Sequence, residues 1–275
     1  MIDRAQAKAT QRRTVALLAG AMAVAAGACG PVVGQPVVFV DGGASTLALG
    51  LVGYWKLDET GADEPVVDSS GQGNTGTPID QPLPSGAGAP VRIANAGSRS
   101  FDGGSQLVDL GNPAALNFAG DVTLAAWVYL TAMPANCAVV LAHGYRHNPN
   151  AELALRASGD VPCEVDNGPA RWSAGIWDDG GNHMAETPLL ASDINVWIHI
   201  AGTFDGNAWH LYKNGSEMSV LVHDVGAFPF DAPWGIGGRS TVSPPDPRSW
   251  PGRLDEVRIY NRALSPSEIL ALYHL

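Results

Sequence analysis

From Leu51 onward, short apolar or alternating stretches are separated by clusters of Gly, Pro, Asn and Asp about every dozen residues. This pattern is typical of an all-β sandwich. No regular alternation of helical and strand patterns is present, which argues against a parallel α/β sheet. The expected strands are Gly53–Leu57, Ser100–Asp102, Leu107–Leu110, Val122–Leu130, Ala138–His143, Glu152–Ala157, Arg171–Trp177, Trp197–Phe204, Ala208–Lys213, Trp234–Gly237 and Asp255–Tyr260.

Two local signals are sharper than the rest. Asn214-Gly215 follows the expected strand 208–213, and both residue types tolerate the positive φ of a tight hairpin turn. Near the C-terminus, Ser265, Pro266 and Glu268 form a capping box with proline at the first helical position. The pattern predicts one short C-terminal helix whose apolar face packs on the sandwich.

The N-terminal residues resemble an export signal. Four basic residues precede an apolar stretch, 15–28, that is short for a membrane span and ends in small residues. Ala26 to Cys29 resembles a bacterial lipobox, which implies that Cys29 is lipidated. We expect 1–29 to be a signal peptide, 30–50 a linker and 51–275 one domain. A short transmembrane anchor, a twin-arginine signal at Arg12-Arg13, and an edge strand at Val37–Val40 are alternatives.

Charge and cysteine content indicate in which compartment the protein is found. Residues 1–29 hold four of the 16 Lys and Arg residues and one of the 27 Asp and Glu residues, which leaves 12 against 26 and a net charge of −14. Such a surface repels nucleic acid. If Cys29 carries lipid, Cys137 and Cys163 can pair in an oxidising compartment, with two free thiols as the alternative. We expect a secreted or cell-surface protein.

Six blocks of sequence, in order and spacing, resemble the laminin-G-like (concanavalin A-like) jelly-roll family of bacterial extracellular proteins. The resemblance implies two antiparallel sheets in a jelly roll, a role in binding or adhesion, and often a bound Ca²⁺. The closing block is the most specific of the six. The blocks are 50–59, 68–76, 100–103, 122–128, 197–206 and 252–265.

Four side chains form a candidate calcium site. Asp255 alternates with Val257 and Ile259 and therefore faces apolar surroundings, where an unpaired carboxylate is costly. An antiparallel pairing of first and last strands would bring Asp58 near it, and Asp68 and Asn74 lie in the Gly-rich loop that follows. The loop is not an EF-hand. Alternatively, Arg253 or Arg258 neutralises Asp255, while Asp68 and Asn74 stabilise turns.

The sequence contains no complete catalytic motif of the kinds considered. Sandwich glucanases carry carboxylates in a Glu-x-Asp-x-x-Glu pattern, but the nearest match, Glu164-Val165-Asp166, has Pro169 at the last position. No nucleophile elbow, His-Glu-x-x-His motif or phosphate loop is present. We therefore expect a protein that is not an enzyme, with a glycosidase of unrecognised site as the less favoured alternative.

Aromatic side chains indicate where a saccharide could stack. Trp250 lies in a proline-rich segment, and Trp177 and Tyr145 lie near segments particular to this chain. We expect these three residues to bind ligand, whereas Trp55, Trp127, Trp197 and Trp209 are expected in the core or facing a sheet. Trp250 could instead cap one end of the sandwich. The expected partner is an extracellular carbohydrate or glycoprotein; a protein-binding or structural lipoprotein is the alternative.

Overall fold

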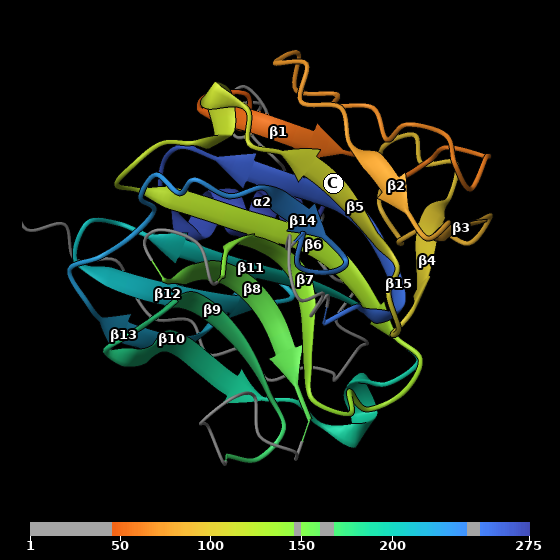
Figure 1. Cartoon of the computed structure of the whole chain (residues 1–275). Coiled ribbons are helices and arrows are strands. Elements are labelled where there is room, and N and C mark those ends of the chain that lie inside the picture. The colour runs from red at the N-terminus through yellow and green to blue at the C-terminus, as the bar shows by residue number, and fades with distance from the viewer. Residues whose placement is uncertain (1–45, 146–149, 160–167, 241–247) are drawn as a thin grey trace, which may run out of the picture. The chain divides into compact units, whose positions relative to one another are not determined.

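A computed structural model describes residues 46–145, 150–159, 168–240 and 248–275. These residues form two antiparallel sheets packed face to face, as Figure 1 shows. The all-β, two-sheet prediction is confirmed. The signal peptide, Cys29 and most of the predicted linker lie outside the described residues.

The eight-stranded sheet has the last strand of the sequence in its middle. Strand β15 pairs with β6 on one side and with both β4 and β1 on the other. Across the sheet the order is β13 (Ser216–Val222), β12 (Ala208–Lys213), β11 (Trp197–Phe204), β6 (Val122–Leu130), β15 (Pro251–Tyr260), β4 (Ser98–Asp102) and β3 (Leu83–Ser85), with β1 (Leu51–Trp55) beside β15.

The seven-stranded sheet is built mainly from the middle of the chain. Two 3₁₀ turns, Ala114–Leu116 and Ala191–Asp193, lie in connections between strands. The order across the sheet is β10 (Gly181–Pro188), β9 (Arg171–Asp178), β8 (Glu152–Ser158), β7 (Cys137–Gly144), β14 (Trp234–Ile236), β5 (Leu107–Gly111) and β2 (Thr77–Ile79).

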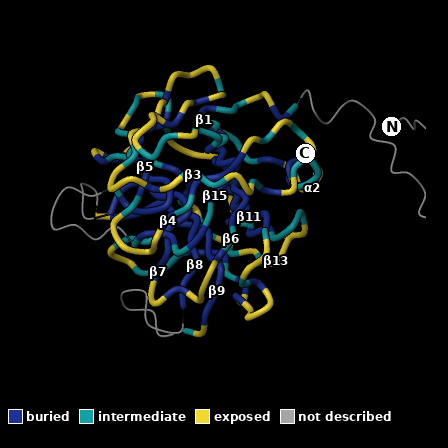
Figure 2. Tube along the Cα trace, turned by 90° about the vertical axis from the view of Figure 1, so that its right-hand side faces the viewer, coloured by how far each residue is buried: buried dark blue, intermediate teal, exposed yellow. Residues whose placement is uncertain are grey.

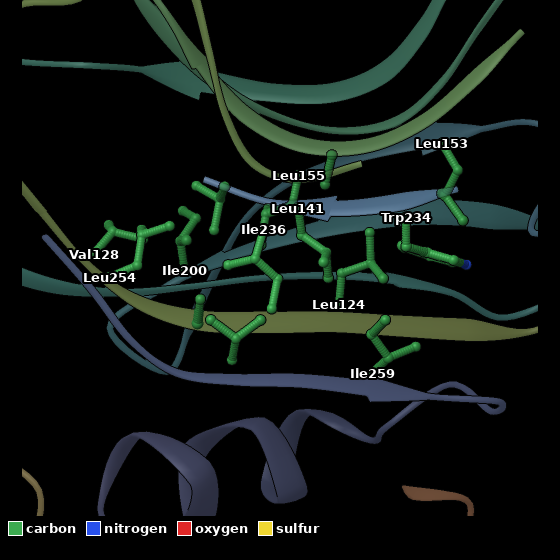
Figure 3. Close-up of a cluster of buried hydrophobic side chains, with 14 of the residues drawn as sticks. Leu124, Val128, Leu141, Leu153, Leu155, Ile200, Trp234, Ile236, Leu254 and Ile259 are labelled. Atoms are coloured by element: carbon green, nitrogen blue, oxygen red, sulfur yellow. The ribbon is translucent and has the colours of Figure 1, made fainter. Parts of the chain in front are cut away.

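The core fills the space between the two sheets, because alternate residues of each strand point inward. Figure 2 shows the buried residues concentrated along the central strands. Figure 3 shows aliphatic side chains of both sheets meeting at this interface. The eight-stranded sheet contributes Leu124, Val128, Ile200, Leu254 and Ile259, and the other sheet contributes Leu141, Leu153, Leu155, Trp234 and Ile236.

The predicted C-terminal helix is α2 (Pro266–Tyr273), which lies against the outer face of the eight-stranded sheet (Figure 3). Ser265 and Glu268 form the expected reciprocal cap. The predicted hairpin turn is also confirmed, because Asn214 and Gly215 have φ values of 51° and 78° between β12 and β13. In the described residues, no helix is both long and apolar enough to cross a bilayer.

The folded region begins slightly before the expected domain start at residue 51. Leu47 is buried beside Tyr260 and Leu264. The Arg262 guanidinium donates to the backbone oxygens of Thr46 and Leu49 at 2.8 and 2.7 Å. The end of the predicted linker is therefore attached to the closing segment of the domain.

We predict that Gly202→Ala destabilises the protein by about 1–3 kcal/mol, because added volume in a packed core forces neighbouring groups apart. A Cβ at Gly202 would lie 2.3 Å from the Cβ of Ala174 on the opposite sheet. Urea unfolding measures the change. Gly86→Ala is the control, because no atom lies within 4 Å of a Cβ there and we expect its effect to stay within about 0.5 kcal/mol. Equal effects of the two substitutions would contradict the prediction.

Candidate functional site

Asp68 organises the Gly-rich loop that follows β1. Its Oδ1 accepts hydrogen bonds from the backbone N–H groups of Tyr54 and Ser70 at 3.0 and 2.8 Å, and its Oδ2 accepts one from Asn74 at 2.9 Å. The Asn74 amide donates to the Val52 oxygen at 2.8 Å. Both side chains therefore fasten the loop to β1, which is the turn-stabilising role.

Asp58 and Asp255 are brought to one segment by the antiparallel pairing of β1 and β15. Asp58 Oδ1 accepts from the N–H groups of Ala96 and Gly97 at 2.9 and 2.8 Å. Asp255 Oδ2 accepts from the N–H of Ala89 at 2.7 Å and from the Asn95 amide at 2.8 Å. Two of the four predicted metal ligands thus face the segment 87–97.

Neither arginine considered as a partner for Asp255 forms a hydrogen bond to it. The Arg258 guanidinium donates to Glu256, and the Arg253 guanidinium lies 3.9 Å from the centre of the Tyr129 ring. Asp255 is fully buried, and its Oδ1 has no hydrogen-bond partner among the residues that the structure describes. Burial, reinforced by the charges of Glu256 and Asp58, raises the pKa of Asp255 to about 7 against two opposing hydrogen bonds.

An unpartnered buried carboxylate oxygen is the kind of group that a hard cation would satisfy. Asp58 and Asp255 fit such an ion, whereas Asp68 and Asn74 are engaged in holding their loop. Across the described ranges, no three His, Cys, Asp or Glu side chains are grouped to hold a metal. A Ca²⁺ ion at this place would therefore need backbone oxygens and water besides the two carboxylates.

A second group of polar residues crosses the outer face of the seven-stranded sheet. The Glu152 carboxylate accepts from Arg239 Nε and Nη2 at 2.5 and 2.6 Å, and from Arg156 Nη1 at 3.4 Å. Burial alone would raise the pKa of Glu152, but the two arginines outweigh it and lower that pKa. Glu152 is thus a fully buried, doubly paired anion.

The chain of contacts continues onto β9 and β10. The Asn182 amide oxygen accepts from Arg156 Nη2 at 3.1 Å, and its nitrogen donates to Glu186 Oε1 at 2.9 Å. The same Glu186 oxygen accepts from Arg171 Nε at 3.0 Å. We call the set Arg239, Glu152, Arg156, Asn182, Glu186 and Arg171 the polar ladder. Its members on β8, β9 and β10 alternate with core-facing residues along these strands, so they lie on the outer face, where Arg239 reaches Glu152 from the segment after β14.

Aromatic rings and a hollow adjoin the polar ladder. Trp177 is half-buried, lies directly opposite Asn182 in the sheet, and has its ring centre 6.1 Å from that of Tyr145. The Arg239 guanidinium stacks on Tyr145 at 3.6 Å. Arg171 and Glu186 line a hollow of about 190 Å³. That is less than the roughly 300 Å³ of a small-molecule pocket, so it could hold only part of a ligand.

Trp250, which the sequence predicts to bind ligand, does not reach the surface. It is fully buried and its ring centre lies 6.1 Å from that of Trp172. The cause is its backbone, which accepts from Gly103 N and donates to Gly237 O, so the side chain is held against the core. Trp250 therefore has the alternative role of closing the hydrophobic interior. Tyr145 is buried too, whereas Trp177 retains an exposed part.

The predicted covalent sites remain predictions. Cys137 is buried at the start of β7, but Cys163 and Cys29 lie outside the described residues. Sequence reasoning missed Asn182, Glu186 and Arg171. A usable signal was the alternation of Arg171 and Ser173 with Trp172, whereas residues 182–186 show no regular alternation of polar and apolar residues.

A sandwich of two antiparallel sheets with a polar outer face defines a lectin-like jelly-roll domain. A family model described as the concanavalin A-like lectin/glucanases superfamily matches residues 102–270, which is more than half of the chain. The chain belongs to this family. No curated protein matches the sequence.

Three solved structures illustrate the likeness. Domain 4 of AbnA, an extracellular arabinanase from Geobacillus stearothermophilus in complex with arabinotriose, is 20% identical with a TM-score of 0.58, covering 82% of this chain and 98% of that domain. The binding domain of Paraclostridial mosquitocidal protein 1 is 17% identical (TM-score 0.54; 82% and 52% covered). Trypanosoma rangeli sialidase in complex with sialic acid is 19% identical (TM-score 0.55; 82% and 32% covered). At these identities the likeness establishes the fold.

We predict that Asp255 lowers the stability of the fold as the pH rises from about 4 to 7. The folded protein holds this proton more tightly than the unfolded chain, so its stabilising effect is complete below the ordinary pKa of 3.8 and lost toward 7. About 1.4 kcal/mol corresponds to one pKa unit, so the change amounts to a few kcal/mol. Asp255→Asn should remove it.

The measured quantity is the difference between the urea-unfolding free energies of the two proteins at each pH, in chelator. The two proteins are compared because His199 also makes the stability depend on pH. Burial, aided by Arg258, lowers the pKa of His199 to about 3, so its contribution to the unfolding free energy rises with pH where that of Asp255 falls. Stability profiles that stay parallel between pH 4 and 7 would contradict the assignment to Asp255.

Proposed function

We propose that the protein is a non-catalytic carbohydrate-binding module that holds a saccharide against the outer face of the seven-stranded sheet. The observation that carries this proposal is the half-buried Trp177 ring directly opposite Asn182, whose amide is fixed on both sides by the polar ladder. A saccharide offers C–H groups to an aromatic ring and hydroxyls to fixed polar groups. Preorganised partners reduce the entropic cost of binding.

The chemistry of the carboxylates supports binding without catalysis. A glycosidase needs an accessible carboxylic acid with a raised pKa beside a second carboxylate. Glu152 is fully buried and held ionised by Arg239 and Arg156. Asp255 has the raised pKa but is fully buried on the other sheet, where no substrate can touch it. Export and lipidation at Cys29 complete the proposal for an extracellular module.

Glycan-array screening followed by calorimetry with the best saccharide tests this function. We expect Trp177→Ala and Asn182→Ala each to weaken binding about tenfold or more, because one removes the stacking surface and the other a fixed pair of polar groups. His210→Ala is the control, since His210 lies on β12 of the other sheet and should bind like the wild type. Absence of binding to any saccharide, or full binding by both variants, would refute the proposal.

We further propose that Ca²⁺ binds between β15 and the segment 87–97, held by Asp58 and Asp255. Support comes from the unpartnered, buried Oδ1 of Asp255 and from the two acidic neighbours that raise its pKa. A bound cation would neutralise this charge and join the first and last strands to one segment. Its role would be structural.

Thermal melts in excess Ca²⁺ and in chelator test this site. We expect Ca²⁺ to raise the melting temperature, because a ligand at about 100 times its Kd stabilises by about 2.7 kcal/mol. Asp255→Asn should lose most of this response. Asp68→Asn is the matched control: it should lower stability equally with and without Ca²⁺, because Asp68 accepts three backbone hydrogen bonds. A wild-type melt unaffected by Ca²⁺ would exclude a tight site.

A further inference from the structure

A second aromatic surface lies on the opposite side of the sandwich, on the outer face of the eight-stranded sheet. Trp197 of β11 pairs directly with Tyr129 of β6, which pairs directly with Arg253 of β15. The three side chains form one row across adjacent strands, because cross-strand partners point to the same face. We call them the aromatic–arginine row. Each of its members is partly exposed.

The row is internally packed. The ring centres of Trp197 and Tyr129 are 5.5 Å apart at 61°. The Arg253 guanidinium carbon lies 3.9 Å from the centre of the Tyr129 ring and 5.1 Å from that of Trp197. Stacking on two rings holds the guanidinium in place, and a cation above aromatic faces is stabilised there. The arginine is therefore positioned before any ligand arrives.

The indole N–H of Trp197 distinguishes it from the other seven tryptophans, all of which the structure describes. Four of those seven donate to protein acceptors, and three have buried N–H groups without a partner. The Trp197 N–H belongs to neither group: it has no acceptor among the described residues and is accessible to solvent there. It is available to an acceptor brought by a ligand. The four are Trp55, Trp172, Trp209 and Trp234, and the three are Trp127, Trp177 and Trp250.

Arg253 also has hydrogen-bond donors that are available to a ligand. Its Nη1 donates to the Ala87 oxygen at 3.0 Å, while Nε and Nη2 have no acceptor in the part of the chain that the structure describes and are not buried there. Nε and Nη2 are the two donors of one edge of a guanidinium, which matches the two oxygens of a carboxylate. The same arrangement occurs elsewhere in this protein, because Arg239 Nε and Nη2 each donate a hydrogen bond to one oxygen of the Glu152 carboxylate.

We propose that the aromatic–arginine row is a second binding site, specific for a carboxylate-bearing saccharide such as a uronic acid residue. The sugar ring lies along Trp197, the carboxylate accepts from Nε and Nη2 of Arg253, and a ring or hydroxyl oxygen accepts the Trp197 N–H. Because the chain is strongly acidic, an anion finds little general attraction here, and binding depends on this bidentate contact.

The test compares an oligogalacturonate with its methyl ester, because esterification removes the negative charge and keeps the sugar. We expect calorimetry to show wild-type binding of the acid at least tenfold tighter than binding of the ester. Trp197→Ala should weaken binding of the acid about tenfold or more. Arg253→Lys keeps a positive charge but loses the paired donors. It should therefore bind the acid less than tenfold more tightly than the ester.

Two further measurements keep the result interpretable. His210→Ala, on β12 of the same sheet and outside the aromatic–arginine row, is the matched control and should leave oligogalacturonate binding unchanged. Loss of oligogalacturonate binding in Trp177→Ala but not in Trp197→Ala would assign the binding to the proposed carbohydrate face and overturn this proposal. In ¹⁵N-resolved NMR, the Trp197 indole and Arg253 Nε signals should shift on titration without any substitution. The proposal is overturned if acid and ester bind alike, if neither binds at millimolar concentration, or if these two signals stay in place.

Discussion

The fold depends on the central position of its last strand. Strand β15 pairs with β6 along one edge and with β4 and β1 along the other, so the first and last described strands are neighbours. Leu51 lies opposite Tyr260, which closes a very long loop, and such closure has an entropic cost that only the completed sheet offsets. The helix α2, the residues 46–49 and the segment 87–97 all attach to β15 or to the turn that follows it.

A local irregularity in β15 determines how its acidic residues are used. The register with β6 shifts between Asp255 and Arg258, and Glu256 has a φ of 53°, as in a β-bulge. Both consecutive carboxylates are consequently buried. Glu256 is satisfied in part by Arg258 and by the Tyr54 hydroxyl at 2.7 Å, whereas Asp255 accepts hydrogen bonds only from uncharged groups of the segment 87–97. The bulge thus places Glu256 in an ion pair with Arg258 and leaves Asp255 without a cationic partner among the described residues.

The sequence predicted the fold well wherever hydrophobic alternation was strong. The ranges of β6, β11 and β12 were predicted to the residue, as were the hairpin turn and the helix cap. It missed β2, β3, β10 and β13. The first two are three-residue strands with proline at the centre, and β13 has exposed apolar residues, which gives no clear inward face. The start of β10, Gly181 to His183, has turn-like composition.

The candidate sites were less predictable, because they depend on which face of a strand each residue occupies. Asp58 and Asp255 could be placed together from strand pairing alone, whereas the sequence left open whether Asp68 binds a metal or stabilises a turn. Assignment of tryptophans by position in a strand or loop was misleading. Trp250, predicted to bind ligand, is buried, whereas Trp197, expected in the core or facing a sheet, reaches solvent on an outer face. Short-range pattern does not reveal which outer faces remain uncovered.

The position of β15 also has a consequence for synthesis. A ribosome makes β15 after every other described strand, so the middle of the larger sheet is missing until all of those strands have been made. Until then β1, β4 and β6 lack a shared partner, and the growing chain has no way to reach its native topology. Formation of the complete eight-stranded sheet therefore waits for β15, whichever of the other strands have already paired.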